Sequence, residues 1–178
     1  MEKTLPLLFM GKVAERPESI MQYSKQGGDT FQPTSYRQMQ EEIATLAAGF
    51  LELGVQRGDR IGLISDNRKE WLISDLAILG LGAADVPRGC DAVEQEIAYI
   101  LSFSGCRLTV LENEKQLAKV LARKAELPEL SIAIMYDSVA DSVREQAAQK
   151  GITVLMYADL FETGRKRRLA KPGEYEEE

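Results

Sequence analysis

A continuous block at residues 35–89 constrains the fold more than any other part of the sequence. Its first apolar residues are spaced alternately by four and three, which places them on one face of a helix. These residues are Met39, Ile43, Leu46, Phe50 and Leu53. Ser35 precedes the helix and Gln38 follows three positions later, so the two predict a capping box. The block therefore begins with an amphipathic helix that must pack against an apolar layer.

The rest of the block predicts a strand and a second helix. Gly54 follows the last apolar position, where a left-handed residue ends a helix, and a Gly-Asp pair at 58–59 turns the chain into a strand at residues 60–65. Asp66 or Asn67 is expected to cap the next helix. That helix is apolar on nearly all sides, as its sequence over residues 71–79 shows. Such a helix is buried inside a larger layered fold.

The same alternation continues through most of the chain. Upstream, the sequence predicts a helix at residues 4–16 and an antiparallel hairpin at 19–25 and 31–35, joined by a turn at 26–29. Downstream, helices at 93–101, 113–121 and 139–147 alternate with strands at 107–111, 131–135 and 153–155. Alternation of this kind implies crossover connections. We therefore predict an α/β fold with a mostly parallel, doubly wound sheet flanked by helices, and a short antiparallel hairpin near the N-terminus.

The character of the sequence changes at Gly164. A basic run at 165–168 is followed by Lys-Pro-Gly at 171–173 and an acidic end at 174–178, without apolar periodicity. Charge runs of this kind are usually solvated. We interpret residues 1–163 as one α/β subdomain and residues 164–178 as a solvated charged linker.

Composition excludes several classes of function. The chain has 178 residues, no histidine and a formal charge of −6, which argue against histidine-based catalysis and against nucleic-acid binding. The spacing of Cys90 and Cys106 fits neither a redox pair nor a zinc site, so both are interpreted as reduced packing residues, and no metal ligand is assigned. The longest uncharged apolar run, 76–84, is far shorter than the roughly 20 residues that span a bilayer. We expect a cytoplasmic protein.

In a parallel sheet, ligands bind beyond the carboxyl ends of the strands. Arg88 is the candidate binding side chain, because it follows a predicted strand and adjoins Gly89, where a ligand can approach the backbone. A phosphate contact is one interpretation; an arginine that is solvated or paired with Asp91 is the other. Trp71 is interpreted as a core or interface residue rather than a ligand-stacking one. No glycine motif of the dinucleotide-binding or P-loop type occurs.

Five sequence segments, in this order, resemble the N-terminal part of the adenylate-forming, AMP-binding superfamily, and most of all a long-chain fatty-acid–CoA ligase. The segments are TSYRQM at 34–39, LAAGFLELGV at 46–55, GDRI at 58–61, NRKEW at 67–71 and GAADVP at 82–87. Weaker similarity continues to Leu111. Fatty-acid preference is indicated only by the fourth segment.

The resemblance implies a two-step reaction in the complete enzyme, with ATP, Mg²⁺ and coenzyme A as cofactors and a fatty acid as substrate. The family's phosphate loop, its ribose-binding aspartate and its C-terminal lysine have no counterpart in this sequence. We therefore expect an N-terminal fragment that is inactive alone, binds no cofactor by itself and carries no catalytic residue. Its partner is the remainder of the same polypeptide, and the complete enzyme is expected in the cytoplasm or peripheral to the membrane. The resemblance also places Arg88 and Gly89 on the ligand-facing edge, as contacts to coenzyme A or to the phosphate loop.

Two alternatives stay open at this level. One is a self-contained, flavodoxin-like module that binds a nucleotide or serves regulation. The other is an interaction scaffold that self-associates through exposed apolar surface.

Overall fold

The structure is a computed structural model that describes residues 4–25 and 28–172. The helices are α1 (Leu5–Glu15), α2 (Tyr36–Glu52), α3 (Lys69–Gly80), α4 (Glu94–Phe103), α5 (Glu114–Ala122), α6 (Asp141–Gln149) and α7 (Tyr157–Ala170), with a 3-10 turn, η1 (Lys124–Glu126). The strands are β1 (Ile20–Lys25), β2 (Phe31–Ser35), β3 (Arg60–Ile64), β4 (Ala84–Arg88), β5 (Leu108–Leu111), β6 (Ile132–Met135) and β7 (Thr153–Met156). None of these helices is both long and apolar enough to cross a bilayer.

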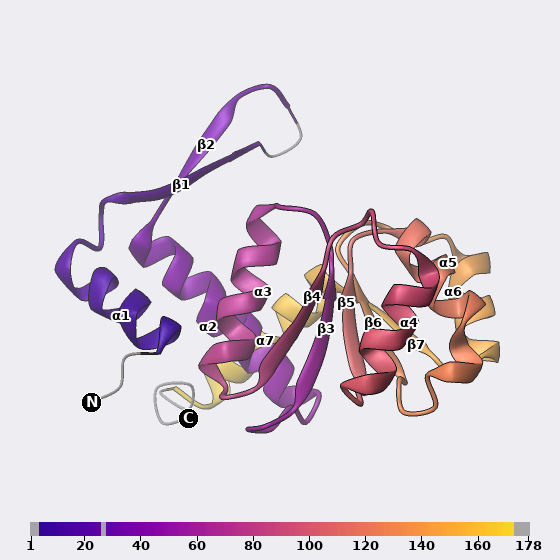
Figure 1. Cartoon of the computed structure of the whole chain (residues 1–178). Helices are drawn as coiled ribbons and strands as arrows, with labels where there is room; N and C mark the ends of the chain where they lie inside the picture. Colours follow the sequence, from indigo (N-terminus) through magenta and orange to yellow (C-terminus); the bar gives the residue numbers. More distant parts are fainter. Residues whose placement is uncertain (1–3, 26–27, 173–178) are drawn as a thin grey trace.

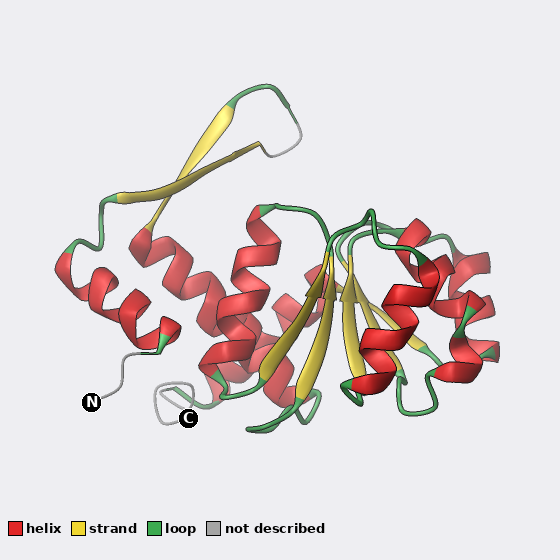
Figure 2. Ribbon diagram, in the orientation of Figure 1, coloured by secondary structure: helices red, strands yellow, loops and turns green. Residues whose placement is uncertain are grey.

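Strands β3 to β7 form one parallel sheet in the order β4-β3-β5-β6-β7 (Figure 1). Helices α2, α3 and α7 pack on one face, and α4, α5 and α6 pack on the other (Figure 2). Each face has its own apolar core, because successive side chains of a strand point to opposite sides. Ile61 and Leu63 of β3 join the first core, whereas Ile64 joins the second. The predicted doubly wound α/β fold is confirmed.

The amphipathic helix predicted at the start of the block is α2, and its capping box is confirmed. The Gln38 amide donates to Ser35 Oγ (3.2 Å), and the Ser35 amide donates to Gln38 Oε1 (2.9 Å). Four of the five predicted apolar positions are fully buried, and Leu53 is partly buried at the helix end. Gly54 follows with a φ of 72°, the left-handed conformation expected there.

Strands β1 and β2 form the predicted antiparallel hairpin, which stands apart from the parallel sheet (Figure 1). Part of its predicted turn, residues 26–27, lies outside the described residues. Helix α1 packs through Phe9, whose ring lies 6.2 Å from that of Tyr36, while Leu5 stays 62% exposed. The N-terminal elements therefore contact the body of the fold through a few side chains.

The linker predicted from Gly164 is wrong as far as Ala170, because α7 continues through these residues and packs against α2. Gly164 is buried, and Arg168 pairs with Glu41 of α2 (2.9 Å). The contact is made by a glycine and by charged side chains, so it leaves no apolar periodicity in the sequence. Residues 173–178 of the predicted linker lie outside the described residues.

Candidate functional site

The candidate site lies at the carboxyl ends of β3, β4 and β5. From β3 the chain crosses to its neighbour β4, and from β5 it crosses in the opposite direction to β6. The loops after β3 and β5 therefore diverge, and this topological switch point is where open α/β sheets bind ligands. An open cleft of about 1360 Å³ occupies this edge, and the residues that line it include Asn67, Trp71, Arg88, Gly89 and Tyr99.

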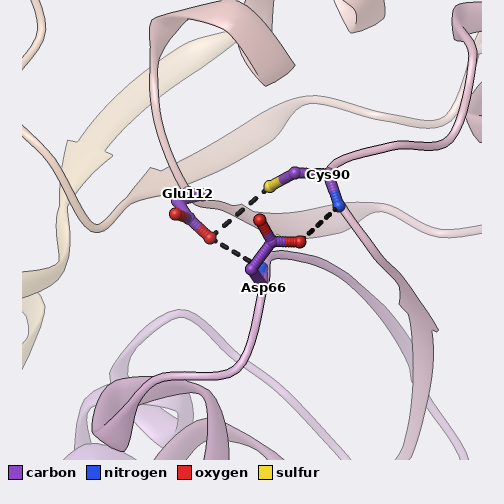
Figure 3. Close-up of side chains that lie close together, drawn as sticks. All are labelled: Asp66, Cys90 and Glu112. Carbon is purple, nitrogen blue, oxygen red and sulfur yellow. Dashed lines mark hydrogen bonds between the residues drawn. The ribbon is translucent and has the colours of Figure 1, made fainter.

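One carboxylate, that of Glu112, ties the strand ends together beside this cleft (Figure 3). Glu112 follows β5, and its Oε2 accepts hydrogen bonds from the Ser65 hydroxyl (2.7 Å) and the Asp66 amide (2.7 Å) after β3. The same oxygen lies 3.4 Å from the Cys90 Sγ after β4. The Asp66 carboxylate in turn accepts from the Cys90 amide (3.0 Å). Three loops from three strands are thus joined through two acidic side chains.

The ligand atoms of Asp66, Cys90 and Glu112 lie within 4.8 Å of one another. Burial, followed by the charge of Glu112, raises the pKa of the Cys90 thiol to about 11. A thiol with this pKa stays protonated at neutral pH and donates to Glu112. Since the Glu112 oxygen already accepts from three donors, we interpret the cluster as a hydrogen-bonded clamp. A mixed thiol and carboxylate set also does not suit Mg²⁺, which prefers oxygen ligands.

A lysine of α5 holds the loop after β4 from its other side. Lys119 Nζ donates to the carbonyl oxygens of Cys90 (2.8 Å) and Ala92 (2.8 Å). A charged donor shared between two carbonyls is stronger than a neutral hydrogen bond. The β5–α5 unit therefore grips the β4–α4 loop through both Glu112 and Lys119.

Arg88 and Gly89 both line the cleft, at the end of β4. The Arg88 side chain is exposed and forms no ion pair with another described residue, so the pairing with Asp91 considered from the sequence is not observed. The Asp91 carboxylate instead lies against Gly89, where a Cβ would be 2.7 Å from its Oδ1. A side chain at Gly89 would therefore displace only the end of an exposed carboxylate, and this contact alone does not require glycine. Asp91 and Glu96 also line the cleft. Their negative charges disfavour the binding of a phosphate group there.

One of the sequence-based expectations about this edge needs correction. Asp66 and Asn67 do not cap α3, because the N-cap position is Arg68, which makes no side-chain cap bond. Asp66 binds the Cys90 amide instead, across the switch point. Trp71 is partly buried and packs against the core that α2 and α3 share, in agreement with the core or interface position expected from the sequence, and it also borders the cleft.

The loop after β6 does not join the cleft, and its side chains make other contacts. The Tyr136 hydroxyl lies 2.8 Å from Ser74 Oγ, and burial raises its pKa well above the ordinary value. Asp137 pairs with Arg68 (3.0 Å), which also stacks 4.9 Å from the Tyr136 ring. These contacts fasten α3 to the sheet.

Sequence reasoning missed the roles of Cys90 and Lys119. Cys106 is buried, as a packing residue should be, but Cys90 belongs to the clamp. Lys119 occupies an ordinary position in an amphipathic helix, and its two carbonyl partners lie 27 and 29 residues away. Glu112, by contrast, directly follows the strand predicted at residues 107–111, so its place at the carboxyl edge of the sheet can be read from the sequence.

Comparison with known proteins shows one family consistently. The family described as AMP-binding enzyme matches residues 11–170. The chain is 31% identical over 133 residues to the long-chain-fatty-acid–CoA ligase ACSBG2 of Xenopus laevis, which covers 75% of this chain and 18% of the relative. It is 29% identical over 134 residues to the chloroplastic long-chain-fatty-acid–[acyl-carrier-protein] ligase AEE15 of Arabidopsis thaliana, again over 75% of this chain and 18% of the relative.

Solved structures agree on the fold. The adenylation domain of a carboxylate reductase from Mycobacterium chelonae superposes with a TM-score of 0.73 at 22% identity, over 92% of this chain and 29% of that one. The anthranilate CoA ligase AuaEII, solved with anthranoyl-AMP, gives a TM-score of 0.70 at 20% identity, over 88% and 27%. The chain spans about a fifth of the length of the curated relatives it matches.

Proposed function

Because the chain belongs to the family of AMP-binding enzymes, we propose that it is the N-terminal part of an ATP-dependent ligase that joins a fatty acid to the thiol of coenzyme A. The observation that carries this proposal is the family match over residues 11–170, together with fatty-acid ligases among the relatives at about 30% identity. The α/β architecture and the cleft at the switch point agree with it.

The proposed reaction has two steps. The fatty-acid carboxylate attacks the α-phosphate of ATP, which forms an acyl-adenylate and releases pyrophosphate. The sulfur of coenzyme A then attacks the acyl carbon, and AMP leaves with the electrons of the broken C–O bond. ATP brings Mg²⁺, whose positive charge stabilises the phosphates in such reactions. Since the acidic cluster beside the cleft does not suit Mg²⁺, we place the metal-binding and catalytic groups in the remainder of the polypeptide.

Within this chain, we propose that Arg88 and Gly89 contact coenzyme A or the phosphate loop of the complete enzyme. Arg88 is exposed at a strand end without an ion pair to a described residue, so its guanidinium is available to a phosphate. Trp71 and Tyr99 line the same cleft and offer apolar surface to the rest of such a ligand.

The test is a comparison of the complete polypeptide with this 178-residue chain. The complete enzyme should release pyrophosphate from ATP in the presence of long-chain fatty acids and form the thioester when coenzyme A is added. The 178-residue chain should do neither. Failure of the complete enzyme with every fatty acid, or turnover by the short chain, would refute the proposal.

The acceptor thiol needs its own control, because one relative is named for coenzyme A and another for acyl carrier protein. Both acceptors should be offered to the preformed acyl-adenylate. Faster transfer to coenzyme A is the expected result, and exclusive transfer to the carrier protein would change the proposed product.

A self-contained nucleotide-binding module is the second candidate, favoured by the cleft at the switch point. Calorimetry on the 178-residue chain with ATP, AMP and FMN separates the two candidates. Micromolar binding of any of them would favour the module.

A further inference from the structure

We infer that the outer edge of β1 pairs with a further strand, and that this strand comes from the remainder of the same polypeptide. The inference rests on the proposed function, in which the chain is one part of a longer enzyme. Two of the curated relatives have ample chain to supply such a strand, since the present chain covers only 18% of each.

The β1–β2 hairpin is a very small sheet with an open face. It stands apart from the parallel sheet (Figure 1). A two-stranded hairpin is only marginally stable in water unless a third strand or a packed face supports it. The register places Tyr23, Pro33 and Phe31 on one face, where Tyr23 is 63% exposed and Phe31 is 59% exposed. A further strand beside the hairpin would cover part of this apolar face.

A proline identifies which edge of the hairpin can accept that strand. In an antiparallel pair, opposite residues alternate between pairs that exchange hydrogen bonds and pairs whose N–H and C=O groups point outward. Pro33 has no N–H, so the Tyr23–Pro33 pair is of the outward kind. The Ser35 amide, two residues along β2, agrees, because it donates to Gln38 Oε1 (2.9 Å) and not to β1. The outer edge of β2 therefore lacks a donor at Pro33, whereas Tyr23 and Lys25 direct their N–H and C=O groups outward from β1.

A groove of about 1080 Å³ follows this edge of β1. Consecutive residues of β1, at 22–25, line one side of the groove, and residues 67–72 around the start of α3 line the other. A groove over one face of a strand would meet alternate residues, so this groove lies beside the edge. Gln22 Nε2 and Ser24 Oγ are buried, and no described residue forms a hydrogen bond with them. Because buried polar atoms are normally paired, the groove is incomplete without a further segment.

The two faces of the hairpin determine the chemistry of the incoming strand. On the face of Tyr23 and Phe31 it should present apolar side chains, because apolar cross-strand neighbours stabilise each other. On the opposite face it should present polar side chains, which can bind the unpaired atoms of Gln22 and Ser24. The partner is therefore an extended segment with alternating apolar and polar residues.

Hydrogen exchange on the complete polypeptide and on the 178-residue chain tests the inference. The amides of Lys25 and Phe31 are a matched pair, because the two residues lie opposite each other and their N–H groups point to opposite edges of the hairpin. In the complete polypeptide, the amides of Tyr23 and Lys25 should exchange at least about 100-fold more slowly than in the 178-residue chain. The Phe31 amide should change by less than about threefold, since the edge of β2 stays unpaired.

Two variants of Tyr23 separate the backbone bond from the side chain. Tyr23→Pro removes the outward N–H at the centre of β1, whereas Tyr23→Ala removes only the ring. In the complete polypeptide, Tyr23→Pro should bring the exchange rate of the Lys25 amide to within about threefold of its rate in the 178-residue chain. Tyr23→Ala should keep this amide at least about tenfold protected.

Several outcomes would overturn the inference. These are equal exchange of the Lys25 amide in both chain lengths, protection of the Phe31 amide in its place, and equal effects of the two Tyr23 variants. Protection that appears in the 178-residue chain as its concentration rises would also overturn it, because the strand would then come from a second copy. If Tyr23→Pro does not fold, the wild-type comparison of Lys25 with Phe31 decides alone. A complete polypeptide that protects Lys25 but forms no thioester would refute the proposed function and support this inference.

Discussion

Replacing Gly164 by alanine is expected to destabilise the chain strongly, because α7 and α2 touch through their backbones at this residue. A Cβ at Gly164 would overlap the Thr45 carbonyl oxygen and lie 2.8 Å from the Gly49 amide nitrogen. The contact is reciprocal, since a Cβ at Gly49 would lie 2.6 Å from the Leu160 carbonyl oxygen. Backbone atoms cannot change rotamer to make room. The two helices would have to separate along their shared interface.

The magnitude follows from two opposing effects. Forcing extra volume into a packed site costs about 1–3 kcal/mol, and a backbone contact belongs at the upper end of that range. Alanine is favoured over glycine within a helix by about 1 kcal/mol, which offsets part of the cost. The expected net loss for Gly164→Ala is about 2 kcal/mol. In a chain of this size it lowers the Tm by about 4–8 °C.

The measurement is urea unfolding followed by circular dichroism, with Gly11→Ala as the control. Gly11 lies in α1, and a Cβ there would meet nothing within 4 Å, so this variant should gain about 0.5–1 kcal/mol from helix propensity alone. Opposite signs for the two substitutions are the expected result. If Gly164→Ala were as stable as wild type, α7 would not pack on α2 as described, and residues 164–170 would behave as the solvated linker first inferred from the sequence.

Three further predictions address charge, the thiol and the surface. Burial and a neighbouring carboxylate raise the pKa of half-buried Asp75 from 3.8 to about 6, so its ionised form destabilises the fold above pH 6 and costs nothing below pH 3.8. This rise in pKa corresponds to at most about 3 kcal/mol of unfolding free energy, which screening by solvent reduces to about 1 kcal/mol. Urea titrations should therefore show Asp75→Asn to be more stable than wild type by about 1 kcal/mol at pH 8 and equally stable at pH 3.5. With a pKa of about 11, Cys90 should react slowly with a disulfide reagent at pH 8, and Glu112→Gln should speed the reaction; an unchanged rate would contradict the clamp. Tyr99 and Phe103 stack with ring centroids 5.8 Å apart, although their side chains are 67% and 79% exposed. Phe103→Ser should therefore reduce any concentration-dependent self-association seen by light scattering. A wild-type chain that is monomeric at all concentrations would show that this surface does not drive self-association.

Local signals in the sequence located the elements of the fold well. The capping pair Ser35 and Gln38, the strand predicted at 60–65 and the strand predicted at 131–135 all lie within one residue of the observed positions. Caps, left-handed glycines and β-branched runs act over a few residues, so their effects are visible in a short window.

The sequence failed where a residue's neighbour lies far along the chain. Gly164 resembles a helix-ending residue, yet it lies inside α7 because α2 leaves no room for a side chain at that point. Asp66 resembles a helix cap, yet it binds an amide 24 residues away. In both cases the local preference was overruled by a tertiary contact.

By itself, the sequence determined the fold class and the family, because periodicity, punctuation and the order of the five segments are properties of the linear chain. Only the tertiary structure decided how the strand-end loops are joined. Glu112 contacts Ser65 and Cys90, which lie 47 and 22 residues away along the chain, and Lys119 contacts Cys90, which lies 29 residues away. The lengths of the crossover connections set these separations. A parallel sheet gathers the carboxyl ends of its strands at one edge. Which side chains then bind one another depends on strand order and register, and neither is written in any single stretch of the sequence.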